Sequence, residues 1–98
     1  MIPNNEARPF VPKGFRLQWE PAQAAHVLLY PEGMVKLNRS AGEILSRCTG
    51  EATFDQIVAD LERSFERNGL QNDVAGFLEL AKGQGWVQWK DDEVTSDE

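Results

Sequence analysis

The chain has 98 residues, of which 41% are hydrophobic and 27% charged, and its net charge is −6. This length suits one domain with a modest core, and no apolar run approaches the ~18 residues that a membrane span needs. The single cysteine and single histidine argue against zinc and iron–sulfur sites, because such sites need several thiolate or imidazole ligands. The first residues lack the basic start and apolar stretch of a signal peptide, so we expect a cytoplasmic protein.

The two ends of the chain differ in composition from its middle. Prolines make residues 1–12 unsuited to a helix, so we expect an extended arm there. The side chains that would anchor this arm to the body are Ile2, Phe10 and Val11. Residues 90–98 hold five acidic residues and one lysine, a composition typical of a disordered, solubilising tail. The single predicted domain therefore spans residues 13–89.

Three segments have the patterns of β-strands. Hydrophobic and polar residues alternate over residues 15–20, which predicts a strand with one buried face. That face would hold Phe15, Leu17 and Trp19. Apolar residues 27–30 and 34–37 flank a Pro-Glu-Gly turn, in which Gly33 can adopt a positive φ, so they predict a β-hairpin. Few residues separate its second strand from a helix, which leaves that strand at an exposed sheet edge.

Apolar residues with helical spacing predict two helices after the hairpin. Ser40 and Glu43 have the spacing of a capping box at the start of the first helix. Thr53 and Gln56 repeat this device, and an apolar stripe then continues for three turns.

A third helix follows, with Asn72 or Asp73 as its cap and Gly85 at its end, and residues 86–89 are a candidate short strand. None of the three helices can bury its apolar stripe alone, so they should pack on one face of the sheet. The predicted fold is α+β and winged helix-turn-helix-like, with a three-stranded antiparallel sheet followed by a three-helix bundle.

No group of residues predicts catalysis. Cys48 falls on the apolar face of the first helix and is interpreted as a small hydrophobe, and His26 as a packing or surface residue. The carboxylate pairs lie on a solvated helix face or in the tail, where no pocket favours acid–base chemistry. We therefore expect no enzyme activity, no metal and no cofactor.

A winged helix also suggests DNA binding, and charge argues against it here. The candidate recognition helix, residues 72–84, has one basic residue, Lys82, against Asp73 and Glu79. Because phosphate contacts supply much of the affinity for DNA, we expect no nucleic-acid binding.

Two features leave a structural and a functional interpretation open. Trp19, Trp86 and Trp89 either cover the ends of a thin core or form an aromatic platform for a partner. Met34 and Leu37 fit core packing, yet an edge strand also offers unpaired N–H and C=O groups to a peptide.

Several segments together resemble the PqqD family of pyrroloquinoline quinone (PQQ) biosynthesis. These segments are GFRLQWEPAQ, LLYPEGMVKLN, SAGEIL with the following Cys-Thr-Gly, TFDQIV and DVAGFL. The similarity runs from about Pro12 to Trp86. One departure is Thr49, where the family often has Asp, and it affects only a turn.

The resemblance implies a peptide chaperone and not an enzyme. PqqD-like proteins bind the precursor peptide PqqA and present it to the radical SAM enzyme PqqE, which cross-links a Glu and a Tyr within it. They take the peptide as an added strand against their third strand, in a groove closed by the third helix. The corresponding peptide-binding residues here are Met34, Val35, Lys36, Leu37, Asn38, Arg39, Val74, Phe77, Leu78 and Ala81.

The residues themselves leave room for other functions. Lys36 and Arg39 offer charge complementarity to an acidic peptide, which suits PqqA or a different ribosomally made modified peptide. A winged-helix DNA-binding regulator is the alternative from another class. The exposed edge also suits pairing with a second copy, as a homodimer or by strand exchange.

Overall fold

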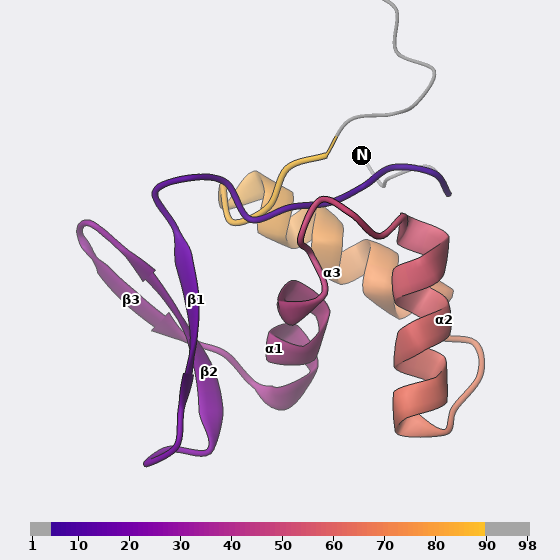
Figure 1. The fold of residues 1–98 in the computed structure, drawn as a ribbon, viewed down its shortest axis with the longest axis horizontal. Helices are drawn as coiled ribbons and strands as arrows, with labels where there is room; N and C mark the ends of the chain where they lie inside the picture. The colour runs from indigo at the N-terminus through magenta and orange to yellow at the C-terminus, as the bar shows by residue number, and fades with distance from the viewer. Residues whose placement is uncertain (1–4, 90–98) are drawn as a thin grey trace, which may run out of the picture.

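The computed structural model describes residues 5–89 and shows a small sheet followed by three helices (Figure 1). The strands are β1 (Arg16–Glu20), β2 (Ala25–Tyr30) and β3 (Gly33–Lys36), and the helices are α1 (Arg39–Ser46), α2 (Phe54–Phe65) and α3 (Gln71–Gly83). The sheet lies on one side of the molecule and the helices on the other. The predicted α+β, winged-helix-like architecture is confirmed. The tail and Ile2 lie outside the described residues.

The sheet is antiparallel throughout, in the order β1-β2-β3. Trp19 lies opposite His26, and Leu28 lies opposite Val35. Tyr30 pairs with Gly33, so only two residues form the hairpin loop. Because β2 is central, β1 and β3 are both edge strands.

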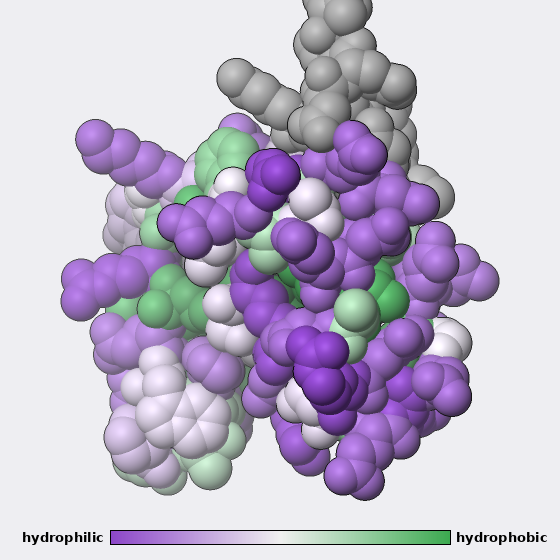
Figure 2. Space-filling view, turned by 45° about the vertical axis from the view of Figure 1, so that its right-hand side comes forward, coloured by the Kyte–Doolittle hydropathy of each residue, from purple (hydrophilic) through white to green (hydrophobic). Residues whose placement is uncertain are grey.

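The core lies between the inner face of the sheet and the three helices. Its buried members include Leu28 and Leu37 from the hairpin, Ile44 and Leu45 from α1, Phe54, Ile57 and Leu61 from α2, and Val74, Leu78 and Ala81 from α3. On the face seen in Figure 2 the surface is mostly hydrophilic, with hydrophobic residues visible only in patches between the polar ones. The helical stripes read from the sequence therefore meet in a single core.

The three tryptophans have different environments. Trp89 is buried and Trp86 half-buried in contact with the core, whereas Trp19 is 51% exposed. The prediction that Trp19 is buried is wrong, because β1 is an edge strand and α1 packs on β2. The Trp19 ring instead contacts the His26 ring edge-on, with 5.1 Å between ring centroids.

Two of the predicted helix caps need correction. The cap of α1 is Asn38, whose side chain accepts the Ala41 N–H at 2.8 Å, and not Ser40, which lies inside the helix. The helix begins earlier because β3 delivers the chain directly to Asn38, with no loop between. The capping box of Thr53 and Gln56 on α2 is confirmed.

The predicted cap of α3 at Asn72 or Asp73 is also wrong. The helix begins at Gln71 after Leu70, and no side chain caps it. The carboxylate of Glu62 on α2 accepts the Leu70 N–H at 3.0 Å, and the Leu70 carbonyl accepts the Val74 N–H. A contact from a neighbouring helix therefore fixes the start of α3.

Residues 5–12 lie along the C-terminal segment and the α1–α2 connection (Figure 1). Phe10 and Gln88 exchange two backbone hydrogen bonds of 2.8 and 2.9 Å, so the predicted strand at residues 86–89 amounts to one bridging residue. The Ala7 carbonyl accepts the N–H of Phe54 at 2.7 Å, the first residue of α2. The segment thus satisfies a helix N–H group that has no partner within the helix.

Helix α1 approaches β2 closely at Gly42. A Cβ atom added to Gly42 would lie 2.6 Å from Nδ1 and 3.0 Å from Cβ of His26. Only a residue without a side chain allows this approach, so Gly42 sets the distance between α1 and the sheet.

Deletion of residues 1–11 should lower the free energy of unfolding by about 2–4 kcal/mol. The deletion exposes the apolar surface covered by the buried Ala7 and Pro9, and it removes the acceptor for the first N–H of α2. Urea unfolding followed by circular dichroism measures the change. An unchanged midpoint would show that the arm lies outside the folding unit.

Replacing Gly42 by alanine should destabilise the protein by about 1–3 kcal/mol, because the new methyl group collides with His26. The matched control is Gly76→Ala in α3, where an added Cβ meets no atom within 4 Å. That variant should gain about 0.5–1 kcal/mol from helix propensity. Thermal unfolding of both variants shows whether each one is less stable or more stable than wild type. A Gly42→Ala protein as stable as Gly76→Ala would contradict the close approach.

Candidate functional site

Strand β3 is an open edge, and its register determines which backbone groups face outward. The Leu37 N–H donates to the His26 carbonyl at 3.0 Å, and the next pairs are Val27 with Lys36 and Leu28 with Val35. Bonded and non-bonded pairs alternate along an antiparallel ladder, so the backbone groups of Val35 point toward β2. Those of Met34 and Lys36 point away from the sheet, where no segment within residues 5–89 pairs with them.

The side chains of β3 separate onto two faces. Val35 and Leu37 point toward the helices, and both contact the core. Met34, 55% exposed, and the exposed Lys36 point to the opposite face. A strand added at this edge would therefore have one face toward the helices and one toward solvent.

The open edge ends at Asn38. Its side chain caps α1, and its carbonyl accepts the Gly42 N–H at 3.0 Å. An extended chain paired with Met34 and Lys36 must therefore leave the edge at Asn38, where the first side chain of α1 is Arg39.

A cavity of about 550 Å³ lies beside the start of α1. Its lining residues are Arg39, Ser40 and Ile44 of α1, Leu61, Ser64 and Phe65 of α2, Glu66, Arg67 and Leu70 of the α2–α3 connection, and Asp73 and Val74 of α3. The buried Ile44, Leu61 and Val74 form an apolar floor, and charged residues surround it. The cavity thus offers an apolar recess with a charged entrance near the end of β3.

Arg39 is an exposed residue of the lining of this cavity. Its guanidinium lies over the Phe65 ring, 5.1 Å from the centroid. Arg39 also lines a second cavity of about 260 Å³, together with Trp19, His26 and Glu43. Among the predicted binding residues, Arg39 is the one that lines both cavities.

The structure separates the predicted α3 residues by exposure. Val74 lines the larger cavity and Phe77 is half-buried, so both lie near accessible surface. Leu78 and Ala81 are 0% exposed, and Leu37 is buried too. These three residues belong to the core and line neither cavity, whereas Val74, although only 2% exposed, lines the larger one.

Sequence reasoning missed the α2 side of the site. Phe65 belongs to the predicted apolar stripe, and the pattern assigns it to the core. Arg67 and Leu70 follow the helix and fit no motif. Only the packing of α1 against α2 brings these side chains beside Arg39, and no signal in the sequence specifies that packing.

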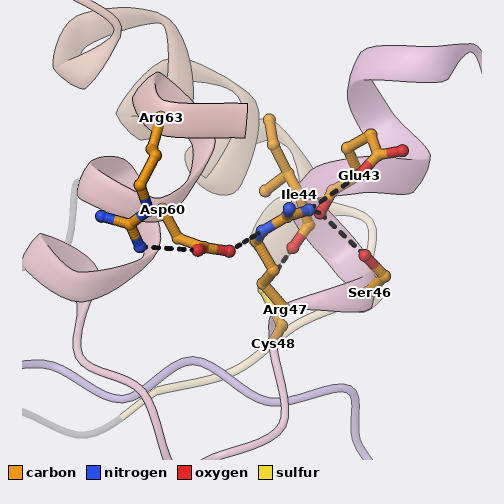
Figure 3. A network of polar contacts seen from close by, with 7 residues as sticks. All are labelled: Glu43, Ile44, Ser46, Arg47, Cys48, Asp60 and Arg63. Carbon is orange, nitrogen blue, oxygen red and sulfur yellow. Dashed lines mark hydrogen bonds and ion pairs between the residues drawn. The ribbon is translucent and has the colours of Figure 1, made fainter. Parts of the chain in front are cut away.

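An ion-pair network joins the end of α1 to α2 (Figure 3). Arg47 donates from Nε to Asp60 at 2.5 Å and from Nη1 to the Glu43 carboxylate at 2.8 Å, and Arg63 donates to Asp60 at 2.9 Å. Burial alone lowers the pKa of Arg47, but the hydrogen bonds to Glu43 and Asp60 outweigh it and raise that pKa. The hydrogen bonds from Arg47 and Arg63 lower the pKa of Asp60.

The described residues contain no arrangement suited to metal or thiol chemistry. Within residues 5–89, no three His, Cys, Asp or Glu side chains gather as metal ligands. Burial raises the pKa of the Cys48 thiol to about 12, and its Sγ donates to the Ile44 carbonyl at 3.3 Å. At neutral pH this thiol is protonated and unreactive.

None of the helices within residues 5–89 has the length and apolar character of a membrane-spanning segment.

Comparison with known proteins identifies similar chains. Residues 25–87 match the model of the family described as coenzyme PQQ synthesis protein D (PqqD). A protein of Stutzerimonas stutzeri named PqqA binding protein is 52% identical over 77 residues, covering 78% of this chain and 84% of that protein. A protein of Pseudomonas aeruginosa with the same name is 50% identical over 88 residues, covering 89% and 96%.

Two solved structures share the fold. One is the NMR structure of the PqqD truncation of Methylobacterium extorquens PqqCD, described as a functional, stand-alone recognition element for ribosomally synthesized and post-translationally modified peptides (RiPPs). Its TM-score is 0.69 at 26% identity, over 82% of this chain and 87% of that one. The heterocyclase TruD has a TM-score of 0.65 at 21% identity, over 91% of this chain and 12% of its own, and shows likeness of fold alone.

Replacing Asp60 by asparagine should destabilise the protein at neutral pH, because the change removes the ion pairs that join Arg47 and Arg63. The pKa of Asp60 is lowered in the folded state, so its contribution is present above the ordinary carboxyl pKa and is lost as pH falls through the folded pKa. The stability gap between wild type and Asp60→Asn should therefore shrink below about pH 4. Urea unfolding at pH 7, 4 and 2.5 measures this gap. A gap that does not vary with pH would contradict the charge-based origin.

Proposed function

Since the chain belongs to the PqqD family, we propose that it binds the precursor peptide PqqA and presents it to the radical SAM enzyme PqqE in PQQ biosynthesis. Its relatives are named PqqA binding protein, which supports PqqA as the peptide that it binds. The solved PqqD truncation is described as a stand-alone recognition element, which supports a role without catalysis. The role is that of a binding protein and not of an enzyme. We expect the protein to act in the cytoplasm, together with PqqE and PqqA.

The open edge of β3 is the observation that carries the binding mode. Met34 and Lys36 each present one N–H and one C=O away from the sheet, which provides four hydrogen-bonding groups to an extended peptide. Four such bonds contribute roughly 0.5–1.5 kcal/mol each. Micromolar binding needs about 8 kcal/mol after the cost of association, so backbone pairing alone is insufficient.

Apolar side chains of the peptide supply the remainder. Half-buried Val35 on β3, half-buried Phe77 on α3 and the apolar recess lined by Val74 would accept such side chains. One or two buried anchors at about 1.5–3 kcal/mol each close the difference. The binding residues in this proposal are Met34, Val35, Lys36, Asn38, Arg39, Val74 and Phe77, with Leu37, Leu78 and Ala81 supporting them from the core.

A second copy of the chain would compete for the same edge. The outward groups of β3 pair as readily with a strand of another molecule as with a peptide. A homodimer through β3 would therefore be incompatible with peptide bound there, so dimerisation and peptide capture should exclude each other.

No observation favours the alternative of a DNA-binding regulator. Lys82, the one basic residue of α3, stacks on the Trp89 ring at 4.4 Å, and Asp73 lies in the first turn of the helix. A recognition helix needs basic side chains free to contact phosphates, and α3 presents none.

Replacing Lys36 by proline should weaken PqqA binding about tenfold, because proline removes one outward N–H at the edge. The matched control is Lys36→Ala, which keeps the N–H and should bind within about twofold of wild type. Calorimetric titration with a synthetic PqqA peptide measures both constants.

Circular dichroism and urea unfolding establish that the Lys36→Pro protein is folded. Val35→Pro should instead destabilise the protein, since the Val35 N–H points toward β2. Equal affinity of Lys36→Pro and Lys36→Ala would overturn strand addition at β3.

A further inference from the structure

Arg39 has a position that helix stability does not explain. It is the first residue of α1, and the first turn of this helix contains no acidic residue. The N-terminus of a helix carries partial positive charge, so a cation there is electrostatically unfavourable. Stabilisation of the helix therefore does not account for the presence of Arg39 at this position.

The guanidinium of Arg39 has no anionic partner among the described residues. The carboxylate one turn along, Glu43, pairs with Arg47 at 2.8 Å. Glu66 and Asp73 line the same cavity as Arg39, but no ion pair or hydrogen bond joins either of them to it. Within residues 5–89, its one polar interaction is the contact with the Phe65 ring.

The contact with Phe65 leaves the donors of Arg39 available. A guanidinium carries five N–H donors, and the contact with the Phe65 ring provides no carboxylate or carbonyl acceptor for them, so they can still bind a carboxylate. The ring also restricts the side chain, which reduces the entropy that a bidentate contact with a carboxylate would cost. Phe65 is itself half-buried against the core and therefore a fixed support.

We propose that Arg39 recognises a single acidic side chain of the bound peptide, at the point where the peptide leaves the edge of β3. This inference rests on the proposed function and specifies the chemistry of the guest. The peptide must turn away at Asn38, and Arg39 follows immediately at the cavity entrance. Besides Arg39, the cavity is lined by one further cation, Arg67, and by the carboxylates Glu66 and Asp73. Its charges therefore balance, and it offers no excess of positive charge to a run of acidic residues.

A double-mutant cycle tests the pairing. Wild-type protein and Arg39→Gln are titrated calorimetrically with a synthetic PqqA peptide and with peptides in which each Asp or Glu is replaced in turn by Asn or Gln. Arg39→Gln should weaken binding of the unmodified peptide five- to tenfold. One peptide substitution should cause a similar loss with wild type and no additional loss with Arg39→Gln.

Four comparisons separate recognition from structure. Arg16→Gln, which removes an exposed cation from β1 at the other edge of the sheet and outside the cavity, should bind the peptide within about twofold of wild type. Arg39→Lys should be intermediate, because lysine keeps the charge but not the bidentate geometry. Arg39→Gln should unfold at the same temperature as wild type or higher, because it removes a cation from a helix N-terminus. Its affinity should also depend less on salt than that of wild type.

The outcomes distinguish this inference from the proposed function. If wild type shows no saturable binding of the PqqA peptide, the proposed function fails. If wild type binds and Arg39→Gln binds equally well, the function stands and the role of Arg39 is overturned. Loss of affinity in Arg39→Gln that adds fully to every peptide substitution would also overturn it, since no carboxylate would then be its partner.

Discussion

The structure depends on the register of β3 against β2. Side chains alternate between the two faces of a strand, so a slip of one residue would move Val35 and Leu37 from the core to solvent. The same slip would turn the backbone groups of Met34 and Lys36 inward. Burial of Leu37 therefore fixes both the core and the set of hydrogen-bonding groups that the open edge presents.

Because β3 leads directly into α1, the register of β3 also fixes the position of Arg39 beside the cavity. Asn38 ends the edge and caps the helix, which fixes Arg39 relative to the last outward group of β3. Gly42 and His26 set how closely α1 lies on β2, and Arg47 joins α1 to Asp60 of α2. Arg39 and Phe65, on different helices, are thereby held at a defined separation.

The sequence predicted most features that depend on local chemistry, although the cap of α1 is Asn38 and not Ser40. The hairpin, the capping box of Thr53 and the three apolar stripes arise from neighbouring residues, and all are present. It did not predict features decided by packing between distant segments. Trp19 fits a buried alternation but lies on an uncovered edge, and the start of α3 is fixed by Glu62, which lies eight residues before Leu70. The cavity beside Arg39 needs three elements at once, so no local pattern encodes it.

The shortness of β3 explains why an edge alone is not a specific site. Four residues of strand provide two outward pairs of backbone groups, and every peptide has the same backbone. This limit protects the chain from indiscriminate pairing, because short edge strands carrying lysine are poor templates for aggregation. In the proposed binding mode, discrimination between peptides comes from side chains that contact the peptide where it leaves the strand. In this chain Arg39 occupies that position, beside a cavity with an apolar floor. The proposed specificity thus comes from the residue that follows the open edge, whereas the register comes from Val35 and Leu37, which face the core.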